Sequence, residues 1–168
     1  MKKIIVIAVA LCCSATHAQS LFDSLRDPHA NELSGYIFVS TGLSDTTLIA
    51  LARDAKRAGM SLVLNGFVDG TPQGWAETTR RVADINAACC GNRGAHWQVN
   101  PLLYQRYKVT ATPAFVIARG SSGRPEDYSK VSGEMGVGNA LKFIAQQSHI
   151  SAIRDKAGEV YMKSFSEQ

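Results

Sequence analysis

What the chain lacks narrows its class before any motif is considered. Beyond an apolar run at its N-terminus it has no stretch of membrane-spanning length, no internal repeat and no low-complexity segment. It also has little net charge, because 18 Lys and Arg stand against 14 Asp and Glu along the whole sequence. That mild, evenly spread balance argues against nucleic-acid binding. A chain of 168 residues, 45% of them hydrophobic, then fits one domain with a single buried core.

The N-terminus has the pattern of an export signal. Lys2 and Lys3 form a positive region, residues 4–13 are apolar, and Thr16-His17-Ala18 places small residues where a cleavage site needs them. The alternative of a retained anchor is disfavoured, because the run has about half the length of a membrane-spanning helix. A lipoprotein signal is disfavoured because it needs Gly, Ala or Ser directly before the modified Cys, whereas Cys12 follows Leu11 and Cys13 follows Cys12. We therefore expect residues 1–18 to be a signal peptide, cleaved after Ala18, and the mature protein to be soluble in the periplasm.

Cysteine is scarce in the part of the chain that would remain. Cys12 and Cys13 leave with the signal peptide, so only Cys89 and Cys90 are left. Free thiols do not persist easily in an oxidising compartment, and we expect these two to form a vicinal or an intermolecular disulfide without catalytic meaning. A redox switch, or a soft-metal site completed by His96, is the alternative. A metal ion needs more ligands at better spacing, so we predict no metal and no cofactor.

The remaining sequence alternates the patterns of strands and helices. Residues 36–40 and 61–68 are rich in β-branched and aromatic residues, which predicts buried strands. Between them, Ser44 is suited to begin a helix and Gly59 to end it. This strand-helix-strand unit should make its two strands parallel neighbours. The later elements are expected as a helix from Thr71-Pro72 with Trp75, Thr79, Val82 and Ile85 inward, a loop at 89–94, a strand at 96–99, a helix from Pro101, a strand after Pro113, a strand at 127–132 and a helix from about Asn139.

These elements predict an α/β domain over residues 35–148, with a central mixed sheet of four to five strands flanked by helices. Residues 19–34 are short and polar, and we expect them to form a flexible arm. Residues 149–168 are expected to be a tail or a helical extension. The two tryptophans, Trp75 and Trp97, are interpreted as core or edge packing and not as a ligand cage.

The segment QVNPLLYQRYKVTATPAFVI (98–117) has a short helix that ends in Tyr-x-Val, followed by Thr-Pro at the head of a strand. This segment and the order of elements resemble thioredoxins and periplasmic disulfide isomerases. The resemblance implies a thioredoxin-like fold in which the Thr112–Pro113 bond is cis. Redox-active members open the first helix with Cys-x-x-Cys, whereas this chain has Thr41-Gly42-Leu43-Ser44 there. Hydroxyls form no disulfide, so dithiol exchange at this site is excluded, and we predict that the protein is not an enzyme.

A narrower resemblance covers roughly residues 36–147. It rests on three segments: IFVSTGLSDTTLIALARDAKRAGMSLVLNGFVDG (37–70), VNPLLYQRYKVTATPAFVI (99–117) and VSGEMGVGNALKFI (131–144). Their order and spacing resemble the TrbC pilus-assembly proteins of F-type conjugative transfer systems. The resemblance implies a periplasmic factor of a type IV secretion apparatus that is needed to assemble the conjugative pilus and acts with a TraW-like partner. The Cys89-Cys90 pair departs from the family pattern, and so does the short region ahead of the fold.

The thioredoxin plan also points to a binding surface. In that plan the 41–44 turn and Thr112-Pro113 meet at the carboxyl ends of parallel strands, where such folds place their ligands. A helix N-terminus, exposed backbone donors and a free strand edge beside Pro113 would suit an extended peptide from a partner. The candidate partner-binding residues are Thr41, Gly42, Leu43, Ser44 and Thr112.

Two alternatives remain open at this point. A partner could instead dock on the outer helices, for example through Arg80-Arg81. The protein could also be a periplasmic thioredoxin-like redox or chaperone protein outside conjugation. Neither alternative involves nucleic acid or stable insertion into a membrane.

Overall fold

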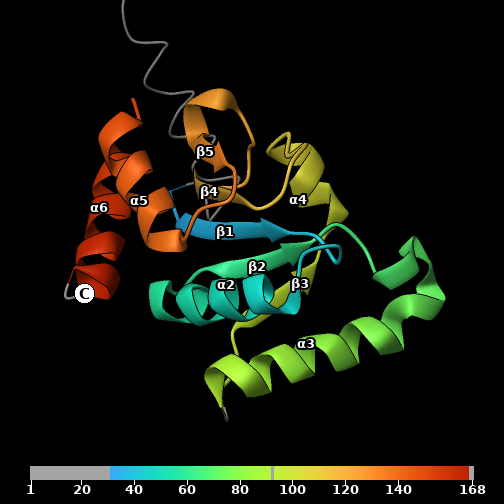
Figure 1. Ribbon diagram of the computed structural model, residues 1–168. Helices are drawn as coiled ribbons and strands as arrows, with labels where there is room; N and C mark the ends of the chain where they lie inside the picture. Colours follow the sequence, from blue (N-terminus) through green and yellow to red (C-terminus); the bar gives the residue numbers. More distant parts are fainter. Residues whose placement is uncertain (1–30, 92, 167–168) are drawn as a thin grey trace, which may run out of the picture.

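The computed structural model describes residues 31–91 and 93–166. It is an α/β fold with a five-stranded, open, mixed sheet flanked by helices (Figure 1). The sheet has the order β3-β2-β1-β4-β5, in which β1, β2 and β3 are parallel and β4 is antiparallel to both of its neighbours. The expected fold class is confirmed, and the arrangement is consistent with the thioredoxin plan. The strands are β1 (Leu33–Val39), β2 (Ser61–Leu64), β3 (His96–Val99), β4 (Ala114–Arg119) and β5 (Tyr128–Ser132).

Helices cover both faces of this sheet. The α-helices are α2 (Asp45–Ala58), α3 (Trp75–Cys90), α4 (Pro101–Arg106), α5 (Val137–Gln147) and α6 (Ser151–Phe165), and three short 3-10 turns are η1 (Val68–Gly70), η2 (Pro72–Gly74) and η3 (Pro125–Asp127). One face packs against α2, α5 and α6, and α3 lies along the outer side of α2. The other face packs against α4 and the residue that follows it.

The two faces have different cores because side chains alternate along a strand. On β1, Ile37 and Val39 face a large, mostly aliphatic cluster with α2, α5 and α6. Phe38 faces the smaller cluster, where Tyr104 and Tyr107 meet it edge-on at ring distances of 4.8 and 6.2 Å. The central strands are therefore buried on both sides, as parallel strands between helices usually are.

The first helix begins and ends where the sequence predicts. The Ser44 side chain accepts a hydrogen bond from the Thr47 backbone N–H at 3.2 Å, which satisfies a donor that the helix itself leaves unpaired. Gly59 adopts a left-handed conformation (φ 65°) and its N–H bonds back to the last turn. Asp45 in the first turn and Arg57 in the last both complement the helix dipole. The strands on either side, β1 and β2, are parallel neighbours as expected.

The segment between β2 and α3 differs from its prediction. The strand expected over 61–68 ends at Leu64, and residues 65–74 form bends and two 3-10 turns. Asp69 adopts φ 65°, which turns the chain. The loop expected at 89–94 begins only at residue 91, because α3 continues through Cys90.

The ends of the domain also differ from expectation. The arm expected over 19–34 gives way to β1 at Leu33, and the expected final helix begins at Val137 instead of Asn139. The C-terminal segment forms α6, which packs on α5 and buries Ile153 and Ala157 in the aliphatic core. The expected signal peptide and the rest of the arm lie outside the described residues. Within the described ranges, no helix has both the length and the apolar character needed to cross a membrane.

Candidate binding site at the carboxyl edge of the sheet

The carboxyl ends of β1, β2 and β3 lie at one edge of the sheet because these strands are parallel. The 41–44 turn leaves β1 at this edge. The antiparallel register pairs Phe38 with Ala114, so Thr112 lies at the same end of the β1–β4 pair. The Thr112–Pro113 peptide bond is cis. The two segments that the sequence singled out are therefore directed to one edge, where open α/β sheets place their ligands.

Arg81 of α3 holds the 41–44 turn from one side. Its guanidinium donates to the carbonyl oxygens of Thr41 and Leu43, the latter at 2.8 Å. It also forms an ion pair with Asp45 through two hydrogen bonds of 2.7 and 2.9 Å. The Arg81 side chain is only 29% exposed. Arg81 is thus committed to internal bonds, which argues against its use as a docking cation on an outer helix.

The donors of the turn are also largely used. Gly42 N–H donates to the Ser40 hydroxyl at 3.1 Å, and Leu43 N–H donates to the Ser40 carbonyl at 3.1 Å. The Ser44 hydroxyl caps α2 and lies 2.9 Å from the Thr47 hydroxyl. The turn therefore offers a partner fewer exposed backbone donors than its sequence suggests.

The expectation of a free strand edge beside Pro113 is wrong. The strand that follows it, β4, is an interior strand, and its first residue, Ala114, pairs with Phe38 on one side and Ser132 on the other. The Pro113 carbonyl accepts a hydrogen bond from Gly133 N–H at 3.0 Å. The strand that the sequence predicts at 127–132 is β5, and it occupies this side of β4, so the ends of the sheet order are β3 and β5.

Tyr104 of α4 supports the same edge from the opposite face. Its buried hydroxyl lies 2.6 Å from the Val39 carbonyl and 3.1 Å from the Val63 carbonyl, so one proton is shared between β1 and β2. Burial raises the pKa of Tyr104, which keeps the hydroxyl protonated and able to donate. The ends of the two central strands are therefore tied together just before the turn.

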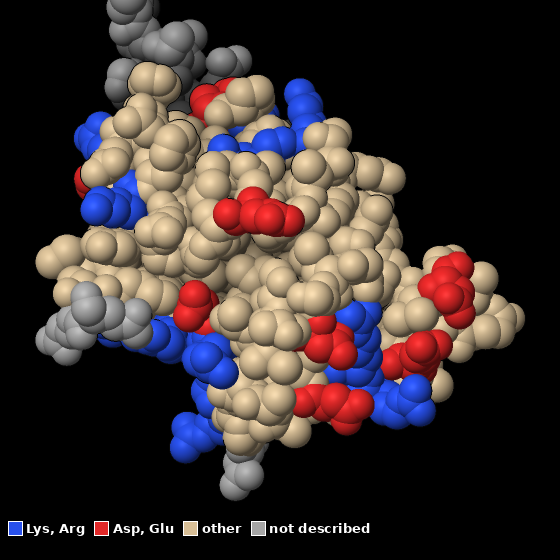
Figure 2. Space-filling view, in the orientation of Figure 1, with Lys and Arg blue, Asp and Glu red and all other residues tan. Residues whose placement is uncertain are grey.

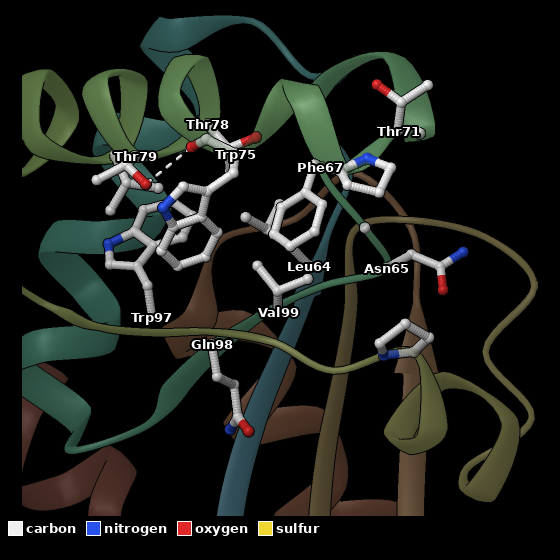
Figure 3. A pocket seen from close by; sticks show the side chains of 15 residues that line it. Leu64, Asn65, Phe67, Thr71, Trp75, Thr78, Thr79, Trp97, Gln98 and Val99 are labelled. Carbon is white, nitrogen blue, oxygen red and sulfur yellow. Dashed lines mark hydrogen bonds between the residues drawn. The ribbon is translucent and has the colours of Figure 1, made fainter.

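A groove of about 780 Å³ opens at this edge between α3 and β3 (Figure 3). Its volume is within the usual range of ligand sites, roughly 300–1,000 Å³. It receives residues from the end of β2, the two 3-10 turns, the first half of α3 and β3, and none of its lining residues is charged. Leu64, Thr78 and Val82 line both this groove and a small cavity that reaches Thr41. The groove and the 41–44 turn are therefore neighbours at one edge.

Aromatic rings form much of the groove wall. Phe67 and Trp75 meet edge-to-face with ring centroids 5.3 Å apart, and Trp75 is 57% exposed. Trp97 of β3 donates its indole N–H to the Asn86 side chain at 3.1 Å. Trp97 lies on β3, the end strand of the sheet, where it packs against the core and also lines the groove. The inward positions expected for Trp75 and Thr79 are wrong, because both residues are exposed and α3 buries Thr78. Ile85 is buried as expected, and Val82 packs against the core.

Thr78 shows why the first turn of α3 has this orientation. Its buried hydroxyl donates to the Gly74 carbonyl at 2.7 Å and accepts from Val68 N–H at 2.8 Å. These bonds join η1 to the start of α3, and Gly74 packs so closely on the Val68 carbonyl that a Cβ would lie 1.8 Å from its oxygen. Trp75, the next residue, is thereby directed into the open groove beside Phe67 (Figure 3). The sequence does not predict this position, because a helical period alone does not show which side of α3 the 3-10 turns occupy.

The remaining cysteines lie at the other end of α3. Cys89 and Cys90 are joined by a disulfide, and Lys56 of α2 donates to the Cys90 carbonyl at 2.7 Å. His96 shares a hydrogen bond of 2.9 Å with the Ser61 hydroxyl. Within residues 31–91 and 93–166, no three His, Cys, Asp or Glu side chains gather in a way that could hold a metal ion. Val82 is the last residue of α3 that lines the groove, and Cys89 follows it by seven positions, or about 10 Å at 1.5 Å per residue.

The charges of the surface form no single-sign field on the face seen in Figure 2, where acidic and basic side chains are interspersed.

Comparison with known proteins gives one family. The model of the type-F conjugative transfer system pilin assembly protein (TrbC) matches residues 37–144, which is more than half of the chain. No curated protein and no solved structure matches. The matched range runs from β1 into α5, so it contains both the turn and the groove.

Proposed function

This chain belongs to the TrbC family of type-F conjugative transfer system pilin assembly proteins, and we propose that it acts in pilus assembly as a periplasmic, non-catalytic protein that binds other proteins. The observation that carries the proposal is the family match over residues 37–144, which covers the sheet except for residues 33–36 of β1. The periplasmic location is supported by the export pattern of residues 1–18. Binding without catalysis is supported by Thr41 and Ser44, which stand where redox relatives have thiols.

The partners we propose are other components of the transfer apparatus, among them a TraW-like protein. The surface that the fold makes available is the carboxyl edge of the sheet, where Thr41, Gly42, Leu43, Ser44 and Thr112 are directed. Gly42 is exposed, and a Cβ there would lie 3.5 Å from the Ser40 hydroxyl, which is an ordinary contact. A large side chain at Gly42 should therefore block a partner without unfolding the turn.

The function is tested by deleting the gene in a donor cell and counting pili and transfer events. We expect pili and transfer to be lost, and to be restored by the full chain. A version that lacks residues 2–18 should fail to restore them, because it would not leave the cytoplasm. Normal pili in the deletion strain would overturn the proposal, and full rescue by the version without residues 2–18 would overturn the periplasmic location.

The 41–44 surface is tested separately with Gly42→Glu and Thr112→Arg. Gln146→Lys on the exposed side of α5 is the control for an added charge. If the corner contacts a partner, the first two variants should remain folded but fail to restore pili, and the control should restore them. Normal pili with both corner variants would show that this corner makes no essential contact.

A further inference from the structure

We propose that the groove between α3 and β3 binds an extended, uncharged segment of a partner protein, which adds to the free edge of β3 as a sixth strand. The inference deepens the proposed function and rests on it for the kind of partner, a protein of the same apparatus. The binding itself rests on three features of the described chain. They are the unpaired edge, the direction of the side chains along it, and the chemistry of the groove.

The edge of β3 offers backbone groups in a usable pattern. Within the described chain β3 pairs only with β2. The Asn100 N–H donates to the Leu64 carbonyl at 2.9 Å, so the backbone of Asn100, and by alternation that of Gln98, faces β2. The N–H and C=O groups of Trp97 and Val99 then face outward. An extended peptide can pair with these groups as it does in other cases of strand addition.

The side chains of the same two residues direct such a peptide toward the groove. Trp97 and Val99 point toward α3, whereas Gln98 points to the opposite face (Figure 3). A strand added beside β3 would place every second side chain on the face of Trp97 and Val99. Those side chains would enter the groove and meet the exposed ring of Trp75 and its neighbour Phe67.

The residues that line the groove determine which peptide side chains can bind there. The groove has no charged residue in its lining. Its polar lining residues are Asn, Thr and Gln98, and the side chain of Gln98 points away from the groove. A charged side chain placed there would lose water without gaining a partner of opposite charge. The segment should therefore be uncharged, with aromatic or branched aliphatic residues at alternate positions, since such residues both favour strands and fill apolar pockets.

The point at which the described chain enters the sheet favours a partner over an internal occupant. The described chain enters the sheet at Leu33, which pairs with Arg119 at the amino end of β1. The groove lies at the carboxyl end, two strands away. Residues ahead of 31 would have to cross the length of the sheet to reach it. A segment supplied by another protein meets no such constraint.

The test uses purified chain from residue 19 onward and overlapping 12-residue peptides that tile the exported proteins encoded in the same transfer region. Binding is measured by tryptophan fluorescence and by amide protection in NMR spectra. We expect an uncharged peptide with alternating apolar residues to bind and to protect the amides of Trp97 and Val99. Trp75→Ala and Val99→Pro should each weaken binding about tenfold or more. Phe143→Ala on α5, which is 50% exposed, should leave binding unchanged.

Backbone methylation of the peptide separates strand addition from simple filling of a pocket. Methyl groups on the amides that face β3 should abolish binding, and methyl groups on the intervening amides should not. Equal binding of both methylated peptides, or equal binding of a three-residue fragment, would overturn strand addition. The inference also fails if no tiled peptide binds, or if removing residues 19–30 is needed before any peptide can bind.

The same variants distinguish this inference from the proposed function. If the deletion strain lacks pili but Trp75→Ala and Val99→Pro both restore them fully, the groove inference falls and the proposed function stands. If the deletion strain makes normal pili, the proposed function falls, while the peptide measurements still decide whether the groove binds an added strand.

Discussion

The 41–44 turn and the groove lie side by side at one edge of the sheet. The polar groups of the turn are bonded within the described chain, whereas part of the backbone beside the groove is not. The carbonyls of the turn are bonded to Arg81, and the strand ends before it are bonded to Tyr104. The groove instead has an exposed Trp75 and the outward-facing backbone of β3. The backbone of the turn is therefore held in place by internal bonds, whereas the exposed ring of Trp75 in the groove can be removed at little cost to the fold.

Arg81→Ala should have the largest effect on stability, and it tests whether the internal bonds of the turn stabilise the fold. Two backbone carbonyls and the Asp45 carboxylate would lose their donor, although water can replace part of it because the side chain is 29% exposed. We expect the free energy of unfolding to fall by about 2 kcal/mol, as is typical for bonds from a charged group. Urea denaturation followed by circular dichroism measures it. Arg80→Ala, at the exposed neighbouring position, should change stability by about 0.5 kcal/mol or less, and an equal loss in both variants would contradict the role of Arg81.

Tyr104→Phe tests the tie on the other face of the sheet. It leaves two buried strand carbonyls without their side-chain donor, so we expect the free energy of unfolding to fall by about 1–2 kcal/mol. Tyr107→Phe is the matched control, since Tyr107 is also buried but its hydroxyl is bonded to no strand carbonyl within the described residues. Removing that hydroxyl should be neutral or stabilising. Thermal melts of the two variants should therefore shift in different directions or by clearly different amounts.

Ser44→Ala tests the cap that joins the turn to α2. Loss of the bond to Thr47 N–H should lower the free energy of unfolding by about 1 kcal/mol. Ser44→Asp keeps an acceptor at the cap and should retain most of the stability. Thr46→Ala, exposed in the first turn, serves as the control. Equal losses of stability in Ser44→Asp and Ser44→Ala, measured in the same denaturation experiment, would contradict a capping role for Ser44.

Trp75→Ala should have the smallest effect on stability. The ring is 57% exposed, so its removal mainly loses the edge-to-face contact with Phe67, and we expect about 0.5 kcal/mol, the lower end for such a pair. Trp97→Ala should cost more, because Trp97 is half-buried and bonded to Asn86. Chemical denaturation of the two variants checks the order. A large loss of unfolding free energy in Trp75→Ala would show that Trp75 stabilises the fold, and the turn and the groove would then not differ in this respect.

Several parts of the fold follow from patterns that act over a few residues. Ser44 and Gly59 bound α2 through bonds to residues no more than four positions away, so the sequence predicts both ends. The spacing of one strand, a helix and another strand predicts that β1 and β2 are parallel. The span expected for β2 is wrong at its end, because apolar residues 67 and 68 continue the strand pattern while the chain turns to meet Thr78.

The candidate site also has one part that the sequence predicts and one part that it does not. Its 41–44 turn could be located from the sequence, because it follows a predicted strand and precedes a recognisable cap. The groove could not, because it combines residues 64–82 with residues 97–101. The free edge was expected at Pro113 and lies instead at β3, since which strand ends a sheet depends on pairings between distant segments.

The sequence by itself determined the family, the α/β class, the ends of α2 and the presence of hydroxyls without thiols at residues 41–44, because each of these follows from local order and spacing. Only the tertiary structure decided that Arg81 closes the turn, that Trp75 lies exposed in a groove and that β3 is the end strand beside it. Arg81 meets its carbonyl partners across 38 and 40 positions of the chain. Contacts of that separation arise from packing, and no helical or strand period in the sequence encodes them.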